Sequence, residues 1–149
     1  MTQAYTQRFT EVHQLIGFDV DTMQIGTYGI LTYVSMANHQ RAIALLHVDD
    51  MAAGATVDLA LWQAKDIAGT GAKVIAGKSI TQLTQAGGDG DDSCAIEVRT
   101  EEMDVNGGYS FISAVLTVAG GTAVIGLIGL LCGNNQIAVP VATWTEIID

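Results

Sequence analysis

The stretch ATVDLALWQAKDIAGTGAKVI, residues 55–75, decides the fold that we expect for the rest of the chain. Its first apolar side chains fall on alternate positions: Val57, Leu59 and Leu61. Asp58 and Trp62 share the opposite side with small residues. Because successive side chains of a β-strand point to opposite faces, this pattern predicts a half-buried strand near 56–65, followed by a glycine-broken loop.

The same alternation recurs along the chain. It is cleanest at 94–100, where the apolar positions are Cys94, Ile96 and Val98. We expect further strands, interrupted by turn signals about every 8–12 residues, at 32–36, 41–48, 109–118, 122–132, 136–141 and 142–147. Residues 73–84 fit either two short strands or a strand and a helical turn. The sequence therefore predicts a mainly β protein. The pattern fits an antiparallel sandwich, jelly roll or barrel, and we expect an antiparallel β-sandwich or jelly-roll-like fold.

Two connections and one terminal segment complete the expected organisation. Apolar residues spaced as on one side of a helix, Tyr5, Phe9, Val12 and Ile16, predict a short amphipathic helix or arm over 4–16. The glycines and aspartates of 17–31 predict irregular structure. Gly120-Gly121 fits a tight hairpin between the strands on either side. We expect an N-terminal helix or arm at 1–18 and one β-rich domain at 19–149.

Composition excludes some classes of protein. The 149 residues suit a single domain. With six Lys and Arg residues and a formal net charge of −10, the chain lacks the charges for a broad basic face, so we expect no nucleic-acid partner. No basic-then-apolar leader opens the sequence, so we expect no signal peptide. Residues 113–133 are apolar enough to suggest a membrane span. Their mid-segment glycines, β-branched residues and lack of flanking Lys or Arg favour two strands instead, and no membrane partner is expected.

No motif in the sequence indicates catalysis, phosphate binding or metal binding. AKVIAGKS, residues 72–79, loosely fits a phosphate loop, but its interior is bulky and β-branched, and glycines interrupt the helix that should follow. Asp89, Asp91 and Asp92 lack the glutamate that an EF-hand loop has at position twelve, so a solvated acidic turn is expected. The histidines, His13, His39 and His47, have no zinc-site spacing. We therefore predict no enzyme, no catalytic residue, no cofactor and no metal site.

Two residue types are expected to pack rather than react. Cys94 and Cys132 lie in no metal or redox motif, and we expect small buried apolar side chains, with a disulfide between them left open. Trp62 and Trp144 more often serve packing or an interface than a ligand-binding box.

Four stretches resemble small capsid-associated proteins of tailed bacteriophages, of the decoration or cement type. They are TQAYTQRF (2–9), TYVSMANHQRAIALLHV (32–48), TVDLALWQAKDIAGTGAKVI (56–75) and CAIEVRTEEMDVNGGYSFISAVLTV (94–118). The resemblance covers most of the chain up to about Val118. It implies a β-rich protein that binds the outside of a capsid, often as a trimer, and braces the shell. It implies no active site.

The resemblance gives a set of expectations about partners. The major capsid protein of the same virion and further copies of this chain would be the partners, on the virion exterior after assembly in the host cytoplasm. Candidate contact residues are Tyr5, Phe9, Ile16 and Trp62. A tail or head–tail joining protein is the alternative within this class. A β-sandwich carbohydrate-binding module, using Trp62 or Trp144 with the 89–92 loop, is the alternative from another class.

Overall fold

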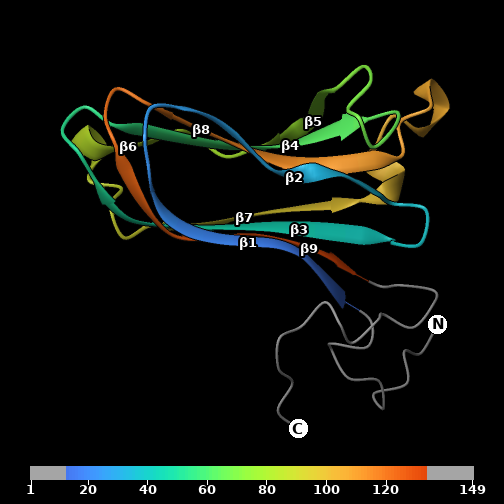
Figure 1. Ribbon diagram of the computed structural model, residues 1–149, viewed down its shortest axis with the longest axis horizontal. Coiled ribbons are helices and arrows are strands. Elements are labelled where there is room, and N and C mark those ends of the chain that lie inside the picture. The colour runs from blue at the N-terminus through green and yellow to red at the C-terminus, as the bar shows by residue number, and fades with distance from the viewer. Residues whose placement is uncertain (1–12, 134–149) are drawn as a thin grey trace, which may run out of the picture.

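Two antiparallel sheets packed face to face form the protein (Figure 1). The computed structural model describes residues 13–133, and within them all side chains except those of 13–22 and 30–32. The described elements are β1 (His13–Met23), β2 (Gly26–Ser35), β3 (Arg41–Met51), β4 (Thr56–Ala64), β5 (Lys73–Ser79), β6 (Leu83–Thr84), β7 (Ser93–Arg99), β8 (Phe111–Ala119) and β9 (Ala123–Gly133), with the 3-10 turns η1 (Gln85–Gly87), η2 (Thr100–Glu102) and η3 (Val105–Gly107). This architecture confirms the predicted antiparallel β-sandwich.

Strand order distinguishes the two sheets. One is four-stranded, in the order β1-β9-β3-β7, and the other is five-stranded, in the order β2-β8-β4-β5 with β6 also pairing with β4. Every recorded strand pair is antiparallel. Chain neighbours β1 and β2 lie in different sheets, as do β3 and β4, so the chain repeatedly crosses from one layer to the other.

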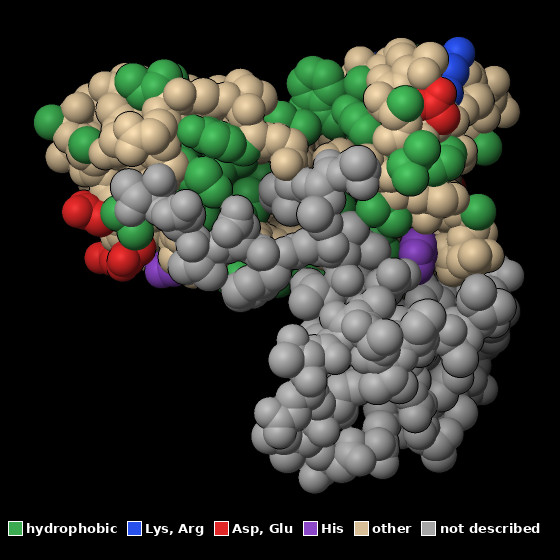
Figure 2. All heavy atoms as spheres, in the orientation of Figure 1, with side chains coloured by type: hydrophobic (Ala, Val, Ile, Leu, Met, Phe, Trp, Pro, Cys, Tyr) green, Lys and Arg blue, Asp and Glu red, His purple; other side chains and the backbone are tan. Residues whose placement is uncertain are grey.

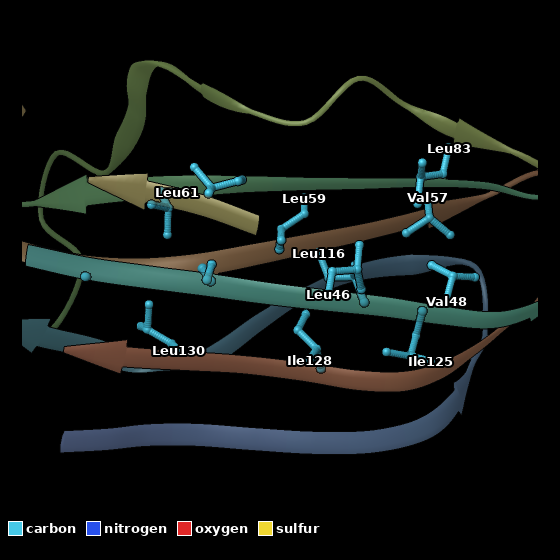
Figure 3. Packing of buried hydrophobic residues seen from close by; sticks show 14 of the residues in the cluster. Leu46, Val48, Val57, Leu59, Leu61, Leu83, Leu116, Ile125, Ile128 and Leu130 are labelled. Carbon is cyan, nitrogen blue, oxygen red and sulfur yellow. The ribbon is translucent and has the colours of Figure 1, made fainter. Parts of the chain in front are cut away.

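The core fills the space between the two sheets, as Figure 3 shows. From the four-stranded sheet it receives Leu46, Val48, Ile125, Ile128 and Leu130, and from the five-stranded sheet Val57, Leu59, Leu61, Leu83 and Leu116. The predicted alternation of β4 is confirmed, because Val57 and Leu61 are fully buried while Asp58 and Trp62 are only half-buried. Burying one such side chain contributes about 1.5–3 kcal/mol relative to leaving it exposed.

The N-terminal prediction is wrong over part of its length. Residues 13–16, the end of the expected helix, belong to β1, and most of the expected irregular segment 17–31 forms β1 and β2. The glycines and aspartates there sit inside strands, and β1 accommodates them by register shifts between Leu15 and Gly17 and between Asp19 and Asp21. Pairing with β9 and β8 overrides the local breaker signals.

The expected hairpin at Gly120-Gly121 is also wrong. The strands on either side, β8 and β9, belong to different sheets, so these glycines carry the chain across one end of the sandwich. Gly120 has a φ of 72° and lies against the backbone of Gly54 in the β3–β4 connection, so that a Cβ at position 120 would collide with the carbonyl oxygen of Gly54. Two crossing connections therefore meet at this point.

Segments that the sequence left open are now placed. Residues 73–84 form two short strands, β5 and β6, and a 3-10 turn follows. The apolar segment 113–133 forms most of β8 and all of β9. Among the residues that the structure describes, no helix is long and apolar enough to cross a membrane.

Candidate contact surface

An apolar surface surrounds Trp62 on the outer side of the five-stranded sheet. We call it the Trp62 surface and define it by five side chains: Tyr33, Trp62, Ile67, Val74 and Phe111. Trp62 lies opposite Val74 in the β4–β5 register, and Ala64 lies opposite Phe111 in the β4–β8 register. Directly paired residues of antiparallel strands present their side chains on the same face. The surface thus joins residues from four strands and the loop between β4 and β5.

Two members of this surface are conspicuously exposed. Ile67 is 62% exposed and Val74 is 40% exposed, while Trp62, Tyr33 and Phe111 are half-buried. Ile25 is similarly exposed at 64%, but it lies just before β2, next to Gly26, which is paired with Val118 at the far end of β8. Exposure alone therefore does not define the surface: Val74 belongs to it because it is paired with Trp62, and Ile67 because its loop approaches the Tyr33 ring at Gly69.

Asp66 fixes the shape of the loop that presents Ile67. Its Oδ1 accepts hydrogen bonds from the backbone N–H groups of Ala68 and Thr70, both at 3.0 Å. Lys65 N donates to Thr70 O at 3.0 Å, and Gly69 N donates to Asp66 O at 3.1 Å. Hydrogen bonds from Thr70 and its neighbours hold the pKa of the Asp66 carboxyl below its usual value. The loop is preorganised by a local aspartate turn.

Tyr109, which lies just before β8, holds the same loop in place. Its hydroxyl donates to the carbonyl oxygen of Gly71 at 3.0 Å, and the Lys73 ammonium lies 4.1 Å from its ring centroid. Lys73 Nζ also donates to Asp104 Oδ2 at 2.6 Å. That contact raises the pKa of Lys73 and lowers the pKa of Asp104. Charged groups therefore border the Trp62 surface, as polar rims border the apolar centres of protein interfaces.

Tyr33 lies on β2, at the edge of the Trp62 surface. A Cβ built on Gly69, whose φ is 85°, would lie 2.8 Å from the Tyr33 ring. The loop after β4 therefore approaches the ring of a β2 residue at a position where only glycine fits. Partial burial raises the pKa of the Tyr33 hydroxyl. The contact ties the loop to the opposite edge of the same sheet.

The phosphate-loop-like motif has a structural role. Residues 73–79 are strand β5, and the lysine that would bind phosphate, Lys78, donates to Glu102 Oε1 at 2.8 Å and to Glu97 O at 2.9 Å. Glu97 lies in β7 of the other sheet and Glu102 follows in η2, so Lys78 bridges the two sheets. Its side chain is only 19% exposed.

The acidic turn is organised by its own backbone. Asp89 Oδ2 accepts from Thr84 N at 2.8 Å, and Asp91 has a φ of 67°. Figure 2 shows acidic side chains at both ends of the visible face, with a lysine or arginine beside them at the right-hand end. Within the described part of the chain, no three His, Cys, Asp or Glu side chains are grouped so that they could hold a metal ion.

The structure separates the candidate residues named from the sequence. Trp62 lies on the outer face of β4. Ile16 lies in β1 at a register shift, and its side chain is outside the described set. Tyr5, Phe9 and Trp144 lie outside the described residues. Trp62 as a contact residue stays a prediction.

Histidines and cysteines are dispersed in the structure. His47 Nδ1 lies 3.0 Å from Ser93 Oγ, and His39 is buried near the β2–β3 connection. Cys132 is buried as expected, whereas Cys94 is only half-buried. Both thiols are free.

Sequence reasoning missed Ile67 and Val74. The available signal was an isoleucine inside a short loop otherwise rich in glycine, alanine and polar residues. Val74 could have been found from the β4–β5 register, because it lies opposite Trp62. That register depends on a bulge between Ala60 and Trp62, which the sequence does not reveal.

Comparisons with known proteins leave the chain without an assigned family. No protein family matches it, and no curated protein matches it. Solved structures that match include one of the infectious bursal disease virus Gt strain, with 10% identity over 91% of this chain and 43% of that chain, at a TM-score of 0.29. A mutant VP2 protein of the same virus, in derived T=1 particles, gives 11% identity, 86% and 40% coverage and a TM-score of 0.29. The chain spans less than half of either matched chain, and likeness at this TM-score carries no argument about function.

Proposed function

We propose that this chain is a non-enzymatic virion structural protein that binds the outside of a bacteriophage capsid and stabilises the shell. The observation that carries the proposal is the Trp62 surface. Exposed Val74 is paired with half-buried Trp62, and exposed Ile67 lies in the adjoining loop, which Asp66 and Tyr109 hold in place. A rigid apolar cluster with a charged border has the anatomy of a protein-binding hot spot. The resemblance of residues 2–118 to decoration proteins names the partner class.

The mechanism is binding by mass action. Contacts that exist only on the assembled shell add free energy to the assembled state and none to the free capsid subunits. Preorganisation matters because ordering a mobile loop on binding costs about 0.5–1.5 kcal/mol for each immobilised side chain. The hydrogen bonds around Asp66 remove much of that cost before the partner arrives. The net charge of −10 favours a basic region of the shell as the docking site.

The test is cosedimentation of the purified chain with particles of the virus that encodes it. We expect saturable binding, which Ile67→Glu weakens at least tenfold, because a charge would be buried at the centre of the contact. Ile25→Glu is the matched control: it places the same charge on an equally exposed isoleucine away from the surface. Failure of the parent chain to sediment with particles at saturating concentration would refute the proposal.

Stoichiometry and mass separate this function from its neighbour in the same class. A decoration protein binds in a fixed ratio to the many copies of the shell protein. For this chain we then expect a small homo-oligomer such as a trimer. A tail or head–tail joining protein would bind a few sites per particle and form a larger ring. Native mass measurement of the free chain, together with the bound ratio, distinguishes the two.

A further inference from the structure

A cavity of about 720 Å3 opens at one end of the sandwich. Its walls are the connection from β2 to β3 and the turns that follow β7, which lie at the same end of the molecule in Figure 1. Pockets that bind small molecules have volumes of about 300–1,000 Å3 and are mostly apolar, with a few convergent polar groups. None of the five residues of the Trp62 surface lines this cavity. It is therefore a separate candidate site of the right size for a small organic molecule.

Hydrogen bonds between the two walls fix the shape of the cavity. Thr100 Oγ1 donates to the carbonyl oxygen of His39 at 2.7 Å, and Thr100 N donates to the carbonyl oxygen of Gln40 at 3.0 Å. Met36 N donates to the carbonyl oxygen of Ser110 at 2.8 Å. All five of these residues line the cavity. A ligand that enters it therefore does not have to order the walls as it binds.

Three apolar side chains line the cavity: Met36, Val105 and Tyr109. Met36 is fully buried and belongs to the core, so the apolar lining is continuous with the interior of the sandwich. Val105 is 56% exposed, so the described residues leave most of its side chain uncovered. The hydrogen bond from the Tyr109 hydroxyl to Gly71 O holds the aromatic ring in place. This lining fits a ligand with an apolar or aromatic body.

Two arginines meet at the wall of the same cavity. Arg41 and Arg99 are directly paired across β3 and β7, and both line the cavity. The Cβ atoms of such a pair are about 4.5–5.5 Å apart, and like charges in this position destabilise a sheet. The chain has only six Lys and Arg residues in total, so a third of its basic side chains lie at this one opening. An anion bound between the two guanidinium groups would offset their repulsion.

The acidic neighbours of these arginines leave their donors available. Arg41 lies 3.5 Å from Glu97, and Arg99 lies 3.5 Å from Glu101. Charge-assisted hydrogen bonds are shorter, at about 2.7–2.9 Å. The two arginine side chains are 51% and 65% exposed, and exposed ion pairs contribute little to stability. Each guanidinium has five N–H donors in a planar fork, which suits a carboxylate or a phosphate.

We propose that this cavity binds a small organic anion that carries a carboxylate or a phosphate on an apolar body. The guanidinium groups of Arg41 and Arg99 hold the acidic group. The apolar body packs against Met36, Val105 and Tyr109. The inference goes beyond the proposed capsid binding and does not depend on it.

The experiment is isothermal titration calorimetry of the full chain with three probes: 2-naphthoate, 2-naphthyl phosphate and the uncharged 2-naphthalenemethanol. They share an aromatic body and differ in charge. We expect one molecule bound per chain, with at least one of the anions binding at least tenfold more tightly than the alcohol. The tighter anion identifies the preferred acidic group. Arg41→Gln and Arg99→Gln should each weaken anion binding at least tenfold and change the affinity for the alcohol little, because only the anions use the charge.

A pair of glutamate substitutions controls for net charge. Val105→Glu places a carboxylate in the cavity and should weaken binding of all three probes at least tenfold. Ile67→Glu, at a similarly exposed apolar residue outside the cavity, should leave all three affinities unchanged. It makes the chain more negative by one charge, as Arg41→Gln also does. Circular dichroism checks that each variant keeps its strands.

Four results would overturn the proposal. Absence of saturable binding by both anions would show that the cavity is not an anion site. Equal affinity for the anions and the alcohol would show that the arginines recognise no charge. Anion binding that neither arginine substitution weakens would lie elsewhere on the chain. Anion binding that Ile67→Glu abolishes and Val105→Glu leaves intact would belong to the Trp62 surface.

Discussion

Lys78 Nζ on β5 donates to Glu102 Oε1 at 2.8 Å, and this contact joins the open edges of the two sheets. The same ammonium donates to the carbonyl oxygen of Glu97 in β7. Glu102 in turn accepts from the backbone N–H of Arg99 at 2.7 Å. Edge strands need protection from pairing with other chains, and a lysine bridge between two edges provides it.

Replacing Lys78 by methionine removes hydrogen bonds with a net contribution of about 1 kcal/mol to the free energy of unfolding. In a domain of this size, that loss should lower the melting temperature by about 2–4 °C. The apolar stem remains, so the loss reports the bridge itself. Thermal unfolding followed by circular dichroism measures it. Lys65→Met is the matched control, because it removes an ammonium group that lies 5.4 Å from the centroid of the Tyr109 ring. An equal shift in both variants would show that Lys78 carries no special role.

Acid should destabilise the fold through Glu102 and Asp104. Lys78 lowers the pKa of Glu102, and Lys73 lowers the pKa of Asp104. A carboxyl whose pKa falls on folding stabilises the protein above its unfolded pKa of about 4 and loses that contribution as pH falls through the folded value. The melting temperature should therefore decline below about pH 4.5. Glu102→Gln should show a shallower decline, and an unchanged pH profile in this variant would contradict the assignment.

Gly120→Ala should cost about 2–5 kcal/mol: 1–2 for the left-handed backbone and 1–3 for the collision with the Gly54 carbonyl. Gly88→Ala isolates the first contribution, because Gly88 has a φ of 81° but no atom within 4 Å of an added Cβ. Urea unfolding of the two variants gives the difference. Equal losses would mean that the two connections do not pack against each other.

Local pattern predicted the strands whose side chains alternate in the sequence. β4 and β7 were found in this way, because Val57, Leu61 and Val98 point into one core. β1 was missed and only the end of β2, near 32–35, was predicted, because Gly17 and Gly29 read as breakers until β9 and β8 supply their partners. Sheet membership also escaped prediction, since an apolar strand has the same local pattern in either layer. This is why Gly120-Gly121 was expected to form a hairpin.

The Trp62 surface was also predictable only in part: the sequence indicated Trp62 but not its neighbours. Trp62 stood out because it breaks the small-residue side of an alternating strand. Ile67 and Val74 join it only through the β4–β5 bulge and the aspartate turn at Asp66. Both features depend on three-dimensional hydrogen bonding rather than on residue type.

Cysteine reactivity tests the placement of β9. Cys94 lies opposite Leu46 and Cys132 lies opposite Ala42, so β3 separates the two thiols. Neighbouring strands are about 4.8 Å apart, which puts Cys94 and Cys132 about 9.6 Å or more apart, beyond the reach of a disulfide. The disulfide left open by the sequence is therefore not expected within one chain.

Burial raises the pKa of the Cys132 thiol to about 12, and burial together with Asp92 and Asp89 raises the pKa of Cys94. The thiolate is the reactive form, so Cys132 should resist a thiol reagent at pH 8 until the protein unfolds, while half-buried Cys94 should react slowly. Labelling of Cys94→Ser followed by mass spectrometry, with and without denaturant, measures this. Rapid modification of Cys132 in the native variant would show that β9 opens readily or lies elsewhere.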